Sequence, residues 1–140
     1  MARPRSRTID VAAVNAVVLD HTALAALGAG NRLTSRLVDA AYNKKNRHVF
    51  VPAMCLAAAT AQRVGIGDHV GLLSALKIVE LDYADACLAG QMIADGVGWE
   101  AAHAVAVGRP TAEFPEGRPV VTAEPERYKG RGVTTIVLSG

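Results

Sequence analysis

Three acidic residues lie at or just after the ends of short apolar segments. Asp20 and Asp82 come directly after such a segment, and Glu124 follows another one with a single alanine between. Acids at the ends of buried strands are uncommon without a partner, so Asp20 is a candidate functional group. Glu124 is a weaker candidate, from its place after a later apolar segment. A plainer explanation stands beside this one. Asp20 and Asp82 are suited to cap helices, and Glu124 to the first turn of one.

Basic residues form a second group with possible chemistry. Lys44, Lys45 and Arg47 lie close together in the chain, and Lys129 and Arg131 flank a glycine. Cationic side chains bind the phosphates of nucleic acids, and a loop with glycine adapts to such a ligand. We therefore treat Lys129 and Arg131 as candidate nucleic-acid contacts. The alternative is that these charges are only solvated.

The apolar pattern predicts that strands and helices alternate along the chain. Strands are expected over 16–19, 48–51, 77–81, 119–122 and 133–138. Helices are expected over 22–42 with a break at 28–30, from 52 to about 63, from an N-cap at Asp68, over 83–94 and over 99–107, with a short turn or helix over 124–128. Such alternation predicts right-handed crossovers and a parallel sheet that is covered on both faces. Sites in such sheets lie beyond the carboxyl ends of the strands, where Asp20, Asp82 and Glu124 stand.

Composition predicts a single α/β domain. The chain has 140 residues, of which 51% are hydrophobic and 4% aromatic, so the core must consist mainly of Ala, Val and Leu. We expect a flexible basic tail over 1–8 and one domain over 9–140. The formal net charge of +2 indicates no particular partner. High apolar content with few charges favours a homo-oligomer, and a purely interacting subunit is a further hypothesis.

The cysteines and the hydropathy pattern predict a cytoplasmic protein. Cys55 and Cys87 lie in separate apolar stretches without CxxC spacing, so we expect both to be reduced core residues. No apolar run approaches the ~20 residues that a membrane-spanning helix needs. We therefore expect no membrane partner.

Taken in order, several motifs resemble the PIN-domain family, the VapC-like ribonuclease fold. Residues 17–24 (VVLDHTAL) are similar to the opening of these domains, an apolar strand that ends in Asp and is followed by a small hydroxyl residue. Residues 51–53 (VPA) resemble the family's strand-to-helix junction, and 119–125 (PVVTAEP) its late strand and acid. The resemblance spans about 15–138 and includes a PIN-like group common in actinobacteria. It implies a three-layer α/β/α sandwich around a parallel sheet of about five strands in the order 3-2-1-4-5.

The resemblance also implies a metal site, but this chain departs from the family's pattern. PIN enzymes use three or four carboxylates to hold a divalent metal that activates water for attack on RNA. Asp20 matches the first acid and Glu124 the last. The second falls near Ala58 and the third aligns with His103, although Glu100, one helical turn earlier, is a candidate for a displaced role. Fewer anionic oxygens predict that Mg²⁺ or Mn²⁺ is bound only weakly.

Two functions follow from the resemblance. The leading hypothesis is a degenerate PIN-like protein with little or no nuclease activity that acts by binding RNA or a protein. The alternative is an active endoribonuclease, the toxin of a toxin–antitoxin pair, with Asp20, Glu124 and Glu100 sharing one Mg²⁺ or Mn²⁺ ion. That alternative implies a small antitoxin-like protein as its partner.

The histidines suggest one more arrangement. A mixed site of His21, His103, Asp20 and Glu124 would provide nitrogen and oxygen ligands, which suit Mn²⁺ or Zn²⁺ better than Mg²⁺. Alternatively, His103 packs against Trp99, because residues four apart share one face of a helix.

Overall fold

The fold is a parallel sheet of five strands with helices on both sides. The structure, a computed structural model, describes residues 14–138. The strands run in the order β3-β2-β1-β4-β5, and every neighbouring pair is parallel. This confirms the PIN-like sheet order expected from the sequence. The strands are β1 (Ala16–Leu19), β2 (His48–Pro52), β3 (Leu76–Val79), β4 (Val120–Thr122) and β5 (Thr135–Val137).

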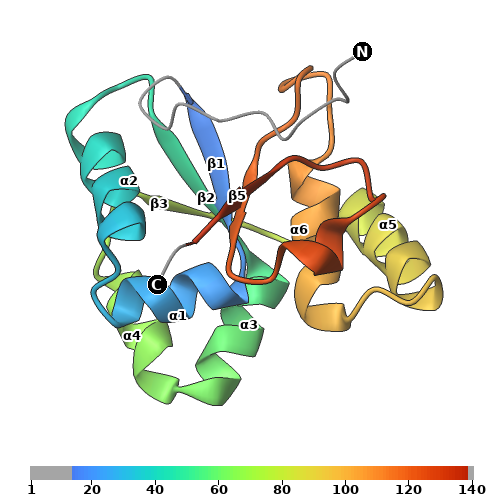
Figure 1. The fold of residues 1–140 in the computed structure, drawn as a ribbon, viewed down its shortest axis with the longest axis horizontal. Helices are drawn as coiled ribbons and strands as arrows, with labels where there is room; N and C mark the ends of the chain where they lie inside the picture. The colour runs from blue at the N-terminus through green and yellow to red at the C-terminus, as the bar shows by residue number, and fades with distance from the viewer. Residues whose placement is uncertain (1–13, 139–140) are drawn as a thin grey trace, which may run out of the picture.

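Helices make up the outer layers. In Figure 1, α2 lies along one side of the sheet, α6 lies on the other side with α5 next to it, and α1, α3 and α4 lie toward the carboxyl ends of the strands. The helices are α1 (His21–Gly28), α2 (Arg32–Asn43), α3 (Ala53–Gln62), α4 (Val64–Gly71), α5 (Tyr83–Ala94) and α6 (Trp99–Gly108), with a 3₁₀ turn η2 (Pro125–Tyr128) after β4.

The central strands and α6 form the core. Every residue of β1 and β4 is buried, as expected for short apolar strands that are covered on both faces. All residues of α6 from Ala101 to Gly108 are buried as well. A Cβ atom on Gly108 would lie 2.9 Å from Cγ2 of Val120, so glycine is what lets α6 approach β4 this closely. Small residues therefore determine how the helix packs on the sheet.

The structure corrects several details of the sequence-based expectations. Helix α4 begins after Arg63, so Asp68 lies inside it and is not its N-cap. A Cβ atom on Gly67 would lie 3.1 Å from Oγ1 of Thr60, which shows that this glycine allows α4 to pack on α3 and does not break the helix. Cys87 is exposed on α5, and of the two cysteines only Cys55 is buried.

The two edge strands are shorter than expected. β3 ends at Val79, and Leu81 beyond it is 40% exposed. β5 covers only Thr135–Val137 of the predicted 133–138. An edge strand has a neighbour on one side only, so its hydrogen-bonded part stops where that neighbour stops. The predicted tail over 1–8 lies outside the described residues. Within residues 14–138, no helix has the length and apolar character needed to cross a membrane.

Candidate functional site

Asp20 occupies the point where the strand order reverses, between β1 and β4. Its side chain is completely buried and caps α1. Oδ1 accepts hydrogen bonds from the Ala23 amide at 2.9 Å and from the Thr22 hydroxyl at 2.6 Å. Oδ2 accepts a third from the Tyr128 hydroxyl at 2.7 Å. Both carboxylate oxygens are therefore already bonded to donors of the protein itself.

Tyr128 is the partner of Asp20 that comes from far along the chain. It belongs to η2 and is only 2% exposed. Burial, and then the charge of Asp20 beside it, raise the pKa of the Tyr128 hydroxyl far above its usual value. The phenol therefore remains a neutral donor to the carboxylate. This contact fixes η2 against the end of β1.

The Cys55 thiol is buried near Asp20. It donates to the Glu100 carbonyl oxygen at a distance of 3.4 Å. Burial raises the pKa of this thiol strongly, and the charge of Asp20 raises it further. A thiol that stays protonated is neither a nucleophile nor a metal ligand. Cys55 therefore acts as a core residue.

Two threonine hydroxyls join the ends of β1 and β4. The Ala123 amide donates to Oγ1 of Thr22 at 2.9 Å, and the Glu124 amide donates to Oγ1 of Thr122 at the same distance. The two hydroxyl oxygens are 3.3 Å apart. These bonds hold the backbone after β4 beside the start of α1. They therefore set the position of Glu124.

Arg127 lies between the other two candidate acids. Its Nε is 2.6 Å from Oε1 of Glu124, and its Nη1 is 3.3 Å from Oε1 of Glu100. Burial alone would lower the pKa of Arg127, but the carboxylates of Glu124 and Glu100 together raise it. The Glu100 pKa is lowered mainly by its own backbone amide and further by Arg127. Two candidate acids of the metal site thus share one cationic side chain of η2.

Gly98 leaves room for this ion-pair cluster. A Cβ atom there would lie 2.3 Å from Oε1 of Glu100 and 3.0 Å from Nη1 of Arg127. Glycine at the N-cap of α6 thus lets the Glu100 carboxylate fold back toward the helix start, where Arg127 reaches it.

His103 is completely buried between α3 and α5. Its Nδ1 accepts from the Met54 amide at 3.3 Å, and its Nε2 is 3.6 Å from Oδ2 of Asp85 without forming a hydrogen bond. Burial lowers the His103 pKa more than Asp85 raises it, so the imidazole is neutral. Trp99 is 46% exposed, so it is not the residue that buries His103.

The candidate metal ligands do not form a metal-binding group. Nδ1 of His21 is buried, with no hydrogen-bond partner among the described atoms. Within residues 14–138, no three His, Cys, Asp or Glu side chains converge in a way that would hold a metal ion. The structure brings Glu100 and Glu124 together, but through Arg127, and it places His103 against Asp85.

The candidate nucleic-acid residues differ in their surroundings. Lys129 is exposed. Arg131 forms an ion pair with the Asp95 side chain and also donates to the Asp95 carbonyl oxygen. Its backbone carbonyl accepts from Nε of Arg109 at 3.0 Å. The Arg131 guanidinium is therefore already bonded to acceptors within the protein.

The sequence reasoning missed both η2 residues that complete this site. Tyr128 is 108 positions from Asp20, and no local pattern marks their contact. Arg127 does stand three residues after Glu124, a spacing at which an ion pair was foreseeable. We refer to Asp20, Glu100, Glu124, Arg127 and Tyr128 together as the carboxyl-edge site.

Comparison with known proteins supports the fold. No protein-family model and no curated protein sequence matches the chain. Among solved structures, a chain of VapBC2 from Rickettsia felis bound to a DNA fragment from its promoter has a TM-score of 0.62 at 15% identity, covering 89% of this chain and 99% of that one. A chain of DNA-bound VapBC from Salmonella typhimurium has a TM-score of 0.60 at 15% identity, with 89% and 98% covered.

Proposed function

We propose that this protein is a PIN-like domain with little or no nuclease activity that acts by binding RNA or a protein partner. One observation carries this proposal: Arg127 and Tyr128 of η2 engage the acids that a catalytic metal would need. Tyr128 donates to Asp20, and Arg127 lies between Glu100 and Glu124. The cation of the site is thus part of the chain itself.

The residues present do not fit a divalent metal ion. Mg²⁺ and Mn²⁺ need several oxygen ligands with free lone pairs, and three donors already occupy the carboxylate of Asp20. Ala58 and His103 stand where the resemblance implies two further acids, and His103 faces Met54 and Asp85. We therefore expect Mg²⁺ or Mn²⁺ to bind weakly.

An RNA cleavage assay tests the loss of activity. A fluorogenic RNA is incubated with the full chain and with Asp20→Asn, each with Mg²⁺ and with Mn²⁺. We expect both proteins to give the same rate as buffer. Robust cleavage by the wild type that is lost in Asp20→Asn would overturn the proposal. Thermal unfolding of both proteins is the control for folding.

Binding of a protein partner is the second part of the proposal. The two structures of similar fold are VapBC assemblies, which supports a small antitoxin-like partner for this chain. We expect a small protein to be encoded next to this chain, and its co-expression followed by affinity purification should yield a stable complex. Labelled RNA tested by fluorescence anisotropy is the parallel arm. If neither ligand binds at micromolar protein, the binding function fails.

The second candidate function is an active ribonuclease that serves as a toxin. The observation in its favour is that Glu100 and Glu124 both contact one side chain, Arg127, which is partly exposed. If Arg127 swung away, these acids and Asp20 would be the candidates to share one ion. Induced expression should then arrest growth, and Asp20→Asn should relieve the arrest.

A further inference from the structure

A cavity of about 330 Å³ lies at the other end of the sheet from the carboxyl-edge site. It lies between α2 and the amino ends of β1 and β2. We call it the amino-edge pocket, and the residues that matter for its chemistry are Val14, Val17, Leu33, Leu37, Lys44 and Arg47. Its size is at the lower end of the range typical of small-molecule sites.

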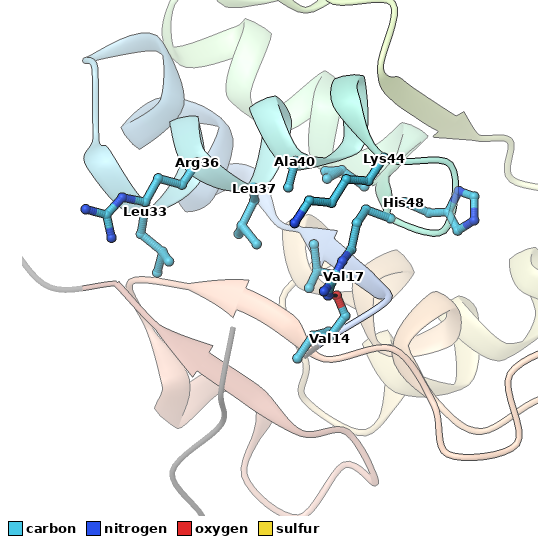
Figure 2. A pocket seen from close by; sticks show the side chains of 10 residues that line it. Val14, Val17, Leu33, Arg36, Leu37, Ala40, Lys44 and His48 are labelled. Atoms are coloured by element: carbon cyan, nitrogen blue, oxygen red, sulfur yellow. Dashed lines mark hydrogen bonds between the residues drawn. The ribbon is translucent and has the colours of Figure 1, made fainter. Parts of the chain in front are cut away.

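The walls of the pocket are aliphatic. Figure 2 shows Leu33 and Leu37 of α2 pointing toward Val14 and Val17 across the cavity. The only ring among the lining residues is that of His48, which points away from the cavity. Binding of nucleobases relies on stacking against aromatic rings, which these walls do not offer. An alkyl chain is the ligand part that such walls favour.

The charges at the pocket are all positive. The Lys44 amino group reaches back over the cavity, whereas Arg36 points outward (Figure 2). Arg47 also lines the pocket and donates through Nη1 to the Val14 carbonyl oxygen, which leaves its other N–H groups for a ligand. No acidic residue lines the pocket, and within residues 14–138 none forms an ion pair with Lys44 or Arg47.

We propose that the amino-edge pocket binds a free amphiphilic anion, a small molecule with an alkyl chain and a carboxylate or phosphate head. The alkyl chain lies between Leu33, Leu37 and Val17, and the head lies against Lys44 and Arg47. Apolar burial and charge-assisted hydrogen bonds would then act on the same ligand. This proposal goes beyond the proposed function and does not depend on whether the carboxyl-edge site is active.

Calorimetric titration with octyl compounds tests the ligand class. Octanoate and octyl phosphate are compared with 1-octanol and octylammonium, all below their micelle concentrations, on the full chain. We expect saturable binding of the two anions and at least about tenfold weaker binding of the alcohol and the cation. Equal affinity for octanoate and 1-octanol, or no saturable binding of either anion, would overturn the proposal.

Matched variants locate the site. Lys44→Gln should weaken octanoate binding about tenfold, because it removes the charged donor over the cavity. Lys45→Gln is the control, since Lys45 is the adjacent exposed lysine and does not line the pocket. Ala40→Leu places a larger side chain on the pocket wall, which should fill the cavity and abolish binding. An equal effect of the two lysine variants would contradict the assignment, whatever happens to Ala40→Leu.

Two further arms separate other ligands. Vesicles containing phosphatidylglycerol test a lipid headgroup in a membrane, and a labelled oligouridine tests RNA. Binding to vesicles without binding of monomeric octanoate would overturn the proposal. Binding of oligouridine without binding of octanoate would also overturn it, if Lys44→Gln and Lys45→Gln weaken the RNA binding equally. Methyl NMR shifts of Leu33 and Leu37 that saturate with octanoate, and are absent in Ala40→Leu, would support it.

Discussion

The two ends of the sheet use charge in opposite ways. At the carboxyl-edge site, Asp20 is fully buried and bonded to three donors, and Arg127 links Glu100 and Glu124. At the amino-edge pocket, Lys44 is exposed, and within the described chain it forms no ion pair. Charges that are satisfied internally contribute to folding, whereas charges left toward solvent remain available to a ligand. We therefore expect a structural role for the charges at the carboxyl-edge site and a binding role for those at the amino-edge pocket.

Replacement of Asp20 should have the largest effect on stability. Asp20→Ala leaves the Tyr128 hydroxyl and the start of α1 without their acceptor, so we expect a loss of about 3 kcal/mol in the free energy of unfolding. Urea denaturation measures it. Lys44→Gln at the other end is the matched control and should change stability by less than about 0.5 kcal/mol. Equal effects of the two variants would show that charge does not have different roles at the two ends of the sheet.

Tyr128→Phe should have the next largest effect. It removes one donor and leaves Oδ2 of Asp20 buried without a partner, which we expect to cost about 2 kcal/mol. If the double variant with Asp20→Ala is no less stable than Asp20→Ala alone, the cost belongs to the bond between the two groups. Additive losses would instead indicate that the Tyr128 hydroxyl contributes to stability independently of Asp20.

His103 should make stability depend on pH. Its folded-state pKa is lowered, mainly by burial, whereas Asp85 and Asp82 oppose the shift. Because the unfolded chain then binds the proton more readily, this contribution is fully present above the unfolded pKa of about 6.5 and is lost as the pH falls toward the folded value. The slope from this one group cannot exceed about 1.4 kcal/mol per pH unit.

Unfolding free energies measured between neutral and mildly acidic pH test this dependence. His103→Gln should flatten the acidic side of the profile relative to the wild type. His69→Gln, at a half-buried position on α4, serves as the control and should not flatten the acidic side of the profile. A profile for His103→Gln that parallels the wild type would show that the buried imidazole does not titrate with unfolding.

Arg127→Gln should have the smallest effect on stability. Its side chain is 35% exposed, so the ion pairs with Glu100 and Glu124 should contribute about 1 kcal/mol or less. The variant also frees two acids at the carboxyl-edge site. Calorimetry with Mn²⁺ should show stronger binding by Arg127→Gln than by the wild type. Unchanged heats would mean that Arg127 does not compete with a cation.

Much of the fold was predictable from local pattern. The fully buried runs in β1 and β4 and the alternation with helices predicted the parallel sheet, and the resemblance gave its order, which the structure confirms. Asp82 was expected to cap a helix, and for Asp20 capping was the plainer alternative to a functional role; both accept the corresponding backbone hydrogen bond. The N-cap expected at Asp68 was wrong, because helix α4 begins earlier and Gly67 within it serves contact between two helices, which no local rule describes.

Local sequence patterns were enough to place the strands and helices and the acid that ends the first strand, because hydrophobic period and capping act over a few residues. What those acids bind depends on segments that meet only in the folded chain. Tyr128 reaches Asp20 across 108 positions, and Arg127 joins Glu100 to Glu124. Such pairings depend on how the end of β4 and η2 fold back over β1 and α6. That geometry comes from packing of the whole domain. The positions of the carboxylates along the chain therefore do not reveal whether they bind a metal ion or side chains such as Arg127 and Tyr128.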